Sequence, residues 1–276
     1  MRTTIVVFTK VPKAGDTKTR LTANRGGILT PAEAMAFYEG CLLDVINVCL
    51  AAGSGDVRVC YNHDGDREYL EKLLDRTSNR SQIKEVYADQ GGNFDQCMQY
   101  AADYILKNGA PDRLADSVVI VGGDLPSLQP VILQDTVAKL ERLAGSEPGR
   151  NAARNIENAP PGLGAALVEG ACQEGGFSVV GYTCTTPFDF NRVFYNTEGI
   201  TALDMLVTKA AQQNIPFGVV EAAPDVDIPV DLASMIPVIK ALELAAQCDK
   251  SIKVPVNTLA VLGEIGLESS AVPPNR

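Results

Sequence analysis

The chain has 276 residues, of which 46% are hydrophobic and 21% charged, and a formal net charge of −10. This length and composition allow one large core, and we expect a single domain over residues 1–249 with a C-terminal extension over 250–276. Its acidity argues against nucleic acid or an anionic membrane as the partner.

Composition also restricts the cellular setting and the chemistry. No apolar run approaches the roughly 20 residues that span a bilayer, and we expect no signal peptide because no cleavage site follows the first strand. The seven cysteines are scattered without a CxxC pair, which favours free thiols in a reducing cytoplasm. The only histidine is His63, which argues against most zinc sites and histidine-based triads. We therefore expect carboxylates, lysines and an oxygen-liganded metal to carry the chemistry.

The first predicted element is a strand over residues 4–8. It is continuously apolar and β-branched, as is typical of a strand buried on both faces of a parallel sheet. Pro12 ends it, because proline cannot continue a central ladder. The loop that follows carries a cluster of cations, namely Lys10, Lys13, Lys18, Arg20 and Arg25.

This basic loop predicts a phosphate site. Five cations against the single acid Asp16 give residues 10–25 a charge of +4, which leaves −14 for the rest of a chain of total charge −10. The cations repel one another, and a docked polyanion would relieve that repulsion, helped by backbone N–H groups near Gly15. Lysine-rich loops are mostly solvated surface. A concentrated positive site on a negative body nevertheless favours a small phosphorylated ligand.

Helices and strands then alternate along the chain. Thr30 and Pro31 begin a helix that ends near Ala52. Further predicted strands are 56–61, 84–88, 117–121, 165–169, 177–182 and 217–220, and further helices are 67–74, 94–107, 130–143, 201–213 and 230–248, with a weak helical pattern over 259–265. This alternation predicts an α/β fold, a three-layer α/β/α sandwich with a Rossmann-like, mainly parallel sheet.

Two segments lack a clear period. Residues 145–164 are rich in Gly, Pro, Asn and Ala, which predicts a mobile insertion or surface loop. The final SSAVPPNR, residues 269–276, has a composition typical of disorder.

Acidic residues follow or adjoin several predicted strands, where ligands gather in such sheets. They are Asp124, Glu174, and the pair Asp225 and Asp227. Aspartate is also a common turn and cap residue, so each acid alone carries little weight. Two aspartates on different loops, opposite a lysine and arginine cluster, can hold a magnesium-type ion and a diphosphate. The absence of GxxxxGK[ST] and GxGxxG motifs argues against a P-loop NTPase and a dinucleotide oxidoreductase.

Five segments, in order, carry a resemblance to a known family. They read FTKVPKAGDTKTRL, QGGN, VVIVGGDLPSL, QEGGFSVVGY and DVDIPVDL, and they cover about residues 3–235. Together they resemble small GT-A-type glycosyltransferase-like proteins, which are related to molybdenum-cofactor and phospholactate nucleotidyltransferases and include a branch linked to arsenosugar biosynthesis. The resemblance implies a nucleotide-diphospho-sugar transferase fold.

The resemblance also implies roles for individual residues. Asp124 and Asp227 would hold magnesium or manganese, with Asp124 at the reacting centre, and Glu174 would act as base or orient the acceptor. The chain departs from the family pattern at Gln173 and Ser127, where the family often has acids, and at Phe177, where it has tyrosine. The residues expected to bind the nucleotide are Lys10, Lys13, Gly15, Lys18, Thr19, Arg20, Gly122 and Gly123.

The leading prediction is a cytoplasmic, metal-dependent transferase that moves a glycosyl group from a nucleotide sugar to a small-molecule acceptor. The first alternative is a nucleotidyltransferase that joins an NTP to a phosphorylated small molecule, using the same ion and loop. The second is a non-catalytic nucleotide-binding protein, which the departures at Gln173 and Ser127 favour. The sequence does not specify the base, the sugar or the acceptor, and it leaves a homo-oligomer open.

Overall fold

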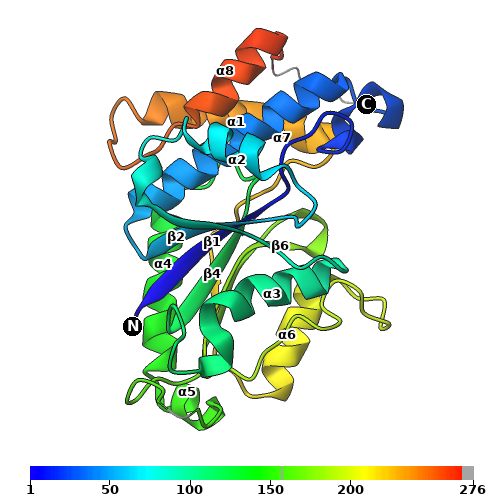
Figure 1. The fold of residues 1–276 in the computed structure, drawn as a ribbon. Helices are drawn as coiled ribbons and strands as arrows, with labels where there is room; N and C mark the ends of the chain where they lie inside the picture. The colour runs from blue at the N-terminus through cyan, green and yellow to red at the C-terminus, as the bar shows by residue number, and fades with distance from the viewer. Residues whose placement is uncertain (157, 269–276) are drawn as a thin grey trace, which may run out of the picture.

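The structure is a computed structural model that describes residues 1–156 and 158–268. Seven strands form one sheet in the order β3-β2-β1-β4-β6-β5-β7 (Figure 1). Strand β6 runs antiparallel to β4 and β5, and the other neighbouring pairs are parallel. The strands are β1 (Thr3–Thr9), β2 (Asp56–Tyr61), β3 (Ile83–Ala88), β4 (Ser117–Gly122), β5 (Leu167–Ala171), β6 (Phe177–Thr183) and β7 (Phe217–Val220).

Helices cover both faces of this sheet. The helices are α1 (Pro31–Ala52), α2 (Arg67–Leu74), α3 (Phe94–Leu106), α4 (Pro130–Ala144), α5 (Glu147–Ala152), α6 (Ala202–Gln212), α7 (Pro229–Ala245) and α8 (Val256–Ile265). Helices α1, α2 and α4 pack on one face in a large apolar core, and α3 and α6 pack on the other face in a second core (Figure 1). The predicted α/β/α sandwich with a mainly parallel sheet is confirmed.

Helix α1 begins as its sequence predicts. The Thr30 hydroxyl accepts a hydrogen bond from the Glu33 amide at 3.2 Å, and the Glu33 carboxylate accepts one from the Thr30 amide at 2.7 Å. Among the described residues, α1 is the one helix long and apolar enough to cross a membrane, but 67% of its apolar window is buried inside the protein. We expected no stretch as long and apolar as a membrane span. By length and composition alone, α1 is such a stretch.

The C-terminal helix α8 packs on α1. Together with the segment around Leu21 and with α7, these helices form a third, smaller core. The Asp44 carboxylate of α1 accepts hydrogen bonds from the amide and hydroxyl of Thr258, each at 2.8 Å. Gly40 allows the close approach, because a Cβ there would lie 3.0 Å from the Asn257 carbonyl oxygen. The described part of the predicted extension thus packs on α1 through the third core. The disorder predicted for 269–276 falls outside the described residues.

The segment expected to be a loop over 145–164 contains a short helix. Ser146 caps α5 by accepting a hydrogen bond from the Gly149 amide at 3.1 Å, and Gly149 is buried. The Gly149 carbonyl in turn accepts from the Ala165 amide at 2.8 Å. The prediction of a mobile insertion or surface loop was wrong for α5, because the composition concealed a serine cap followed by Pro148.

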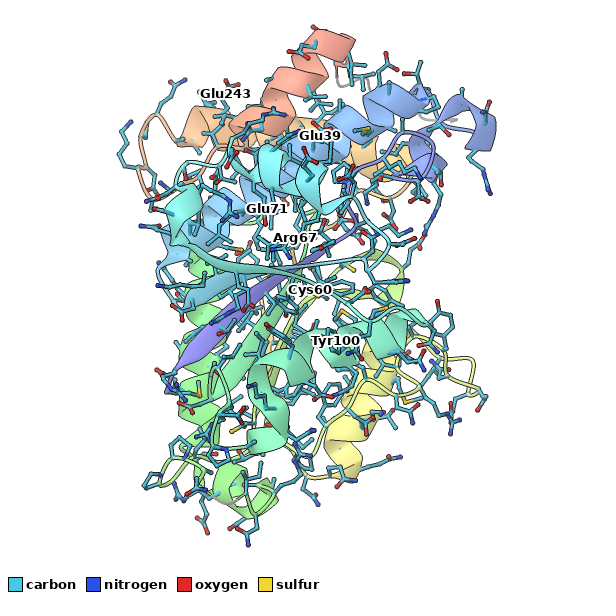
Figure 2. All side chains as sticks on the ribbon, viewed as in Figure 1. Glu39, Cys60, Arg67, Glu71, Tyr100 and Glu243 are labelled. Carbon is cyan, nitrogen blue, oxygen red and sulfur yellow. The ribbon has the colours of Figure 1, made fainter. Side chains whose placement is uncertain are left out.

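The cysteines are free thiols, as predicted. Five are buried, including Cys60 of β2 (Figure 2). The half-buried Glu39 of α1, labelled in Figure 2, accepts a hydrogen bond from Tyr69 of α2 and pairs with Arg76, just after α2, at 3.4 Å. These contacts join the two helices.

Candidate functional site

A cleft of about 910 Å³ opens at the carboxyl ends of β1 and β4. Its walls come from the basic loop after β1, the loops after β2, β3 and β4, the β5–β6 turn and the segment before α7. The register of β1 against β4 pairs Phe8 with Gly122, so both strands deliver their following loops to the same place. This is the edge where parallel sheets bind ligands.

Lys18 lies at the centre of the cleft between two aspartates. Its Nζ is 2.5 Å from Asp124 Oδ2 and 2.6 Å from Asp227 Oδ1, and its side chain is only 7% exposed. Burial alone would lower the pKa of Lys18, but the charges and hydrogen bonds of the two aspartates raise it above its ordinary value. Lys18 therefore stays charged, and it links the basic loop to two carboxylates from distant parts of the chain.

The ammonium group of Lys18 also lowers the pKa of Asp227. Burial would raise the pKa of this carboxyl, but the charge of Lys18 and the hydrogen bond from it, with a smaller contribution from Arg20, hold the pKa below its ordinary value. The Arg20 guanidinium is 3.4 Å from Asp227 Oδ2 and is largely exposed. It extends the positive charge from Lys18 to the rim of the cleft.

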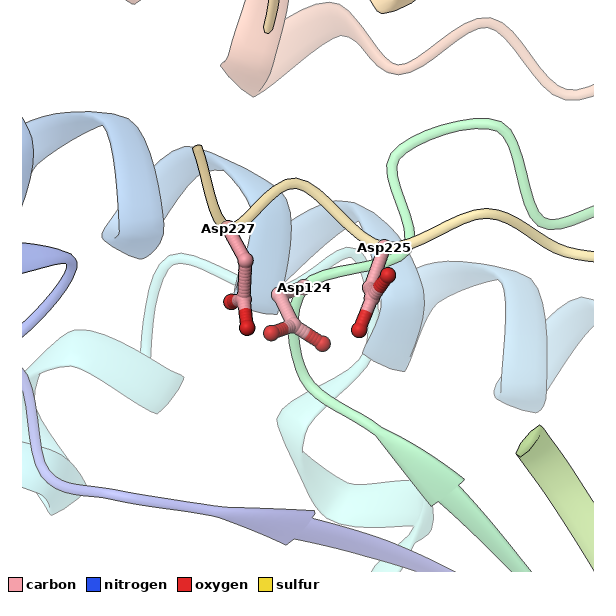
Figure 3. A group of neighbouring side chains, drawn as sticks. All are labelled: Asp124, Asp225 and Asp227. Carbon is pink, nitrogen blue, oxygen red and sulfur yellow. The ribbon is translucent and has the colours of Figure 1, made fainter. Parts of the chain in front are cut away.

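A third carboxylate, Asp225, completes an acidic group. Oxygen atoms of Asp124, Asp225 and Asp227 lie within 4.8 Å of one another (Figure 3). Burial, followed by the charges of Asp124 and Asp227, raises the pKa of Asp225 to about 6. Three convergent carboxylates are the donor set that a hard divalent cation takes, so the residues fit magnesium or manganese. Lys18 contacts two of the three and would compete with such an ion.

Two backbone features shape the floor and rim of the cleft. A Cβ on Gly123 would lie 3.0 Å from the Tyr38 hydroxyl and 3.1 Å from the Thr9 hydroxyl, which are themselves hydrogen-bonded at 2.7 Å. A larger residue at Gly123 would force these side chains to shift by a few tenths of an ångström, so glycine is the best fit directly before Asp124. On the opposite side, Glu174 has a φ of 58°, in the left-handed region, and this turn exposes its side chain at the rim.

Most, but not all, of the sequence-predicted residues line this cleft. The structure places Lys10, Lys18, Thr19, Arg20, Gly122, Gly123, Asp124, Glu174 and Asp227 there. Lys13 and Gly15 are exposed and lie outside its lining. The Lys13 amide donates to the hydroxyl of the buried Thr17 at 2.9 Å, so this residue shapes the basic loop through its backbone.

Sequence reasoning gave no role to Asp231, which supports the acidic group. One oxygen of its carboxylate accepts hydrogen bonds from the Asp227 amide at 3.0 Å and the Ile228 amide at 2.9 Å, and so fixes the turn into α7. The side-chain Nε2 of Gln173 donates to the Asp225 carbonyl at 3.0 Å. Gln173, which stands where the family often has an acid, thus joins the β5–β6 turn to the segment that carries Asp225 and Asp227. An aspartate three residues into a helix is the signal that could have identified Asp231.

Sequence reasoning also missed an aromatic wall, formed by Phe8, Phe94, Phe177 and Phe194. Their side chains follow one another along the cleft, with ring centroids 5.6 Å apart for Phe8–Phe94, 4.5 Å for Phe94–Phe194 and 5.3 Å for Phe177–Phe194. All four line the cleft, although they come from β1, α3, β6 and the segment before α6. No sequence pattern joins residues so far apart.

Comparisons with known proteins agree with this architecture. A family model described as "Uncharacterized protein conserved in bacteria (DUF2064)" matches residues 45–197. The structure of a proposed nucleotide-diphospho-sugar transferase from Desulfovibrio desulfuricans G20 has 20% sequence identity and a TM-score of 0.65, and the match covers 96% of this chain and 98% of that one. A cytidylyltransferase from Leptospira borgpetersenii serovar Hardjo-bovis (strain JB197) has 12% identity and a TM-score of 0.51, with 99% of both chains covered. No curated protein matches the chain in sequence. The fold is that of the nucleotide-diphospho-sugar transferases, as the sequence predicted.

Proposed function

The chain belongs to the DUF2064 family, and we propose that it is a metal-dependent transferase that moves a glycosyl group from a nucleotide sugar to a small acceptor. One observation carries the proposal: Lys18 contacts Asp124 and Asp227 within 2.6 Å, in a cleft where Lys10 and Arg20 add positive charge. Cations beside a convergent acidic group are what a metal-bound diphosphate requires.

In this proposal the basic loop binds the donor. Lys10, Lys18 and Arg20 hold the two phosphates through charge-assisted hydrogen bonds, which are stronger than neutral ones. Asp124 and Asp227, with Asp225 beside them, hold a divalent cation that would neutralise charge on the departing diphosphate. Lys18 then leaves the carboxylates and donates to phosphate oxygens, so its charge stays paired throughout.

The acceptor binds on the opposite side, near Glu174. The acceptor hydroxyl oxygen forms a bond to the anomeric carbon of the sugar, and the bond from that carbon to the phosphate oxygen breaks. The hydroxyl proton passes to the Glu174 carboxylate, and the nucleoside diphosphate leaves with the electron pair of the broken bond. Glu174 fits the role of base because it is exposed on the rim of the cleft and makes no ion pair or hydrogen bond with another described side chain.

Nucleotidyl transfer is the second candidate. The fold that the chain shares with the Leptospira cytidylyltransferase supports this alternative. In that reaction an acceptor phosphate oxygen attacks the α-phosphorus of an NTP, and pyrophosphate leaves. The basic loop and acidic group would serve both reactions. The difference lies in the acceptor side of the cleft, which must hold a phosphate in one case and a hydroxyl in the other.

Product analysis tests the proposal. The protein is incubated with a panel of nucleotide sugars and NTPs, with magnesium or manganese and small acceptors, and an Asp124→Asn variant serves as the control. Release of nucleoside diphosphate from a sugar nucleotide by the wild type alone is the expected result. Pyrophosphate release from an NTP would support nucleotidyl transfer instead. Metal-dependent nucleotide binding without consumption of any donor would favour the non-catalytic alternative.

A further inference from the structure

Charge is divided unevenly between the two sides of the cleft. Its lysine and arginine side chains, among the residues that the structure describes, are Lys10, Lys18 and Arg20, and all three come from the loop after β1. The β5–β6 turn carries the Glu174 carboxylate into the same cleft, whereas Asp225 belongs to the acidic group beside Lys18. A phosphorylated acceptor bound beside Glu174 would therefore meet an acid and neither a lysine nor an arginine of the described lining.

The aromatic wall runs from Phe8 at the end of β1 to Phe177 beside the β5–β6 turn, and it is partly open to solvent. Phe94 is 41% exposed, and Tyr195, which follows Phe194 in the chain, is 59% exposed. The Phe8–Phe94 and Phe94–Phe194 pairs meet at interplanar angles of 72° and 79°. In this edge-to-face arrangement one ring of each pair directs its edge at the face of the other. Exposed aromatic rings grouped in a cleft favour a ligand that covers them.

Buried polar contacts hold this wall in place. The Asp95 carboxylate accepts hydrogen bonds from the Phe194 amide at 2.8 Å and the Tyr195 amide at 3.4 Å, although Asp95 itself is only 5% exposed. Gln99 also accepts from the Phe190 amide at 2.8 Å. The segment that carries Phe194 is thus attached to α3 at two points. A wall fixed before binding lowers the ordering cost of a ligand.

We propose that the acceptor is an uncharged molecule with a hydroxyl group on an apolar ring, and that Phe94, Phe177 and Phe194 bind the ring. This inference rests on the proposed function, which it deepens by naming the acceptor class. The ring covers the aromatic wall, and the hydroxyl points to Glu174. The inference also favours glycosyl over nucleotidyl transfer, because a phosphate acceptor finds no cation on this side of the cleft.

A pair of fluorescent probes tests the acceptor class without a nucleotide. 2-Naphthol and 2-naphthyl phosphate share a ring and differ in the phosphate, and each is titrated into the full chain with excess inorganic pyrophosphate and magnesium present, which occupy the basic loop and the acidic group. We expect 2-naphthol to bind at least about tenfold more tightly than 2-naphthyl phosphate, since a difference of about 1.4 kcal/mol is tenfold in affinity. Equal or tighter binding of 2-naphthyl phosphate, or no binding of 2-naphthol, would overturn the proposal.

Variants locate the probe. Truncation of an aromatic contact that matters typically costs more than about 1 kcal/mol, so Phe94→Ala and Phe194→Ala should each weaken 2-naphthol binding by about fivefold or more. Phe94 is exposed enough for its truncation to leave folding intact, and Phe194→Leu provides a milder change at the more buried position. Tyr100→Ala is the matched control, because Tyr100 is an aromatic residue of α3 that does not line the cleft (Figure 2). Equal affinities in all variants would refute the proposed contact.

Nucleotide binding, measured separately by thermal shift with nucleoside diphosphates and magnesium, distinguishes this inference from the proposed function. Nucleotide binding without 2-naphthol binding would end the inference and leave the proposed function standing. Binding of 2-naphthol without binding of any nucleotide would end the acceptor role together with the proposed function.

Discussion

Lys18 and Asp227 are 209 positions apart in the chain, and their side chains meet at 2.6 Å. The contact joins the basic loop to the segment before α7 within the cleft. It places an ammonium group against two of the three carboxylates that could hold a divalent ion. The buried ammonium of Lys18 therefore partly neutralises the acidic group before a metal ion or a phosphate binds. The roles of the ammonium, the metal ion and the phosphate can be tested separately.

Replacing Lys18 by methionine should make stability depend on metal. The variant leaves Asp124 and Asp227 facing one another without their cation, and removal of one partner from a buried pair should lower the free energy of unfolding by about 2 kcal/mol or more. Magnesium should restore stability in the variant and raise it less in the wild type, where Lys18 competes. Urea unfolding with and without magnesium measures both effects. Lys240→Met, on the exposed surface of α7, is the control. A variant as stable as the wild type, and indifferent to magnesium, would contradict this expectation.

Asp124→Asn should abolish the metal-dependent part of nucleotide binding. The substitution keeps the size of the side chain and removes the charge that a divalent ion needs. Titration calorimetry with a nucleoside diphosphate, with and without magnesium, gives the comparison, and Asp135→Asn on the surface of α4 is the matched control. If magnesium still changes nucleotide affinity to the wild-type extent, Asp124 is not a metal ligand.

Replacing a glycine by alanine should have opposite effects on stability at Gly40 of α1 and at Gly263 of α8. Helix propensity alone favours alanine over glycine by about 1 kcal/mol. At Gly40, however, a Cβ would lie 3.0 Å from the backbone of Asn257, so Gly40→Ala should destabilise the protein by about 1 kcal/mol or more. Gly263→Ala meets nothing within 4 Å and should stabilise it. Denaturant unfolding of both variants measures how tightly α8 packs on α1, and a stabilising Gly40→Ala would contradict the observed packing.

Glu169 should make stability depend on pH. It is 3% exposed, and its Oε2 has no hydrogen-bond partner among the described residues. Burial raises the pKa of this carboxyl, so the folded state binds its proton more tightly than the unfolded state does. The free energy of unfolding therefore falls as pH rises from the unfolded-state value of about 4.3 through the folded-state pKa, and it stays lower above that.

Glu169→Gln removes this contribution. Relative to the wild type, the variant should gain stability as pH rises through the same window, which urea unfolding from about pH 4 to 8 measures. A stability difference that does not change with pH would show that Glu169 titrates alike in both states.

Local signals predicted most of the fold. Thr30, Pro31 and Glu33 specify the start of α1 through contacts within one turn, and the apolar runs of β1 and β4 mark strands buried on both faces. Helix α5 was missed because a single serine cap and one proline were hidden in a loop-like composition. Prediction therefore failed where a helix is short and its start is marked by one cap residue and one proline.

The candidate site was only partly predictable, because strand order brings its members together. The carboxyl ends of parallel strands share an edge, so Lys18 and Asp124 could be expected near one another. The aromatic wall could not be predicted, since Phe94 and Phe194 meet only after α3 and the segment before α6 have packed. Asp95, which fixes that segment, reads in the sequence as an ordinary acid in the first turn of a helix.

In our proposal the basic loop and the aspartates together form a site for a nucleoside diphosphate. Calorimetric titration of the wild type and Lys18→Ala with ADP, GDP, CDP and UDP in magnesium buffer tests it most directly. We predict that at least one of the four binds, and that Lys18→Ala weakens its binding by ~1.5–3 kcal/mol, the range for a charge-assisted contact. Binding of none of them to the wild type, or equal affinity in both proteins, would contradict the claim.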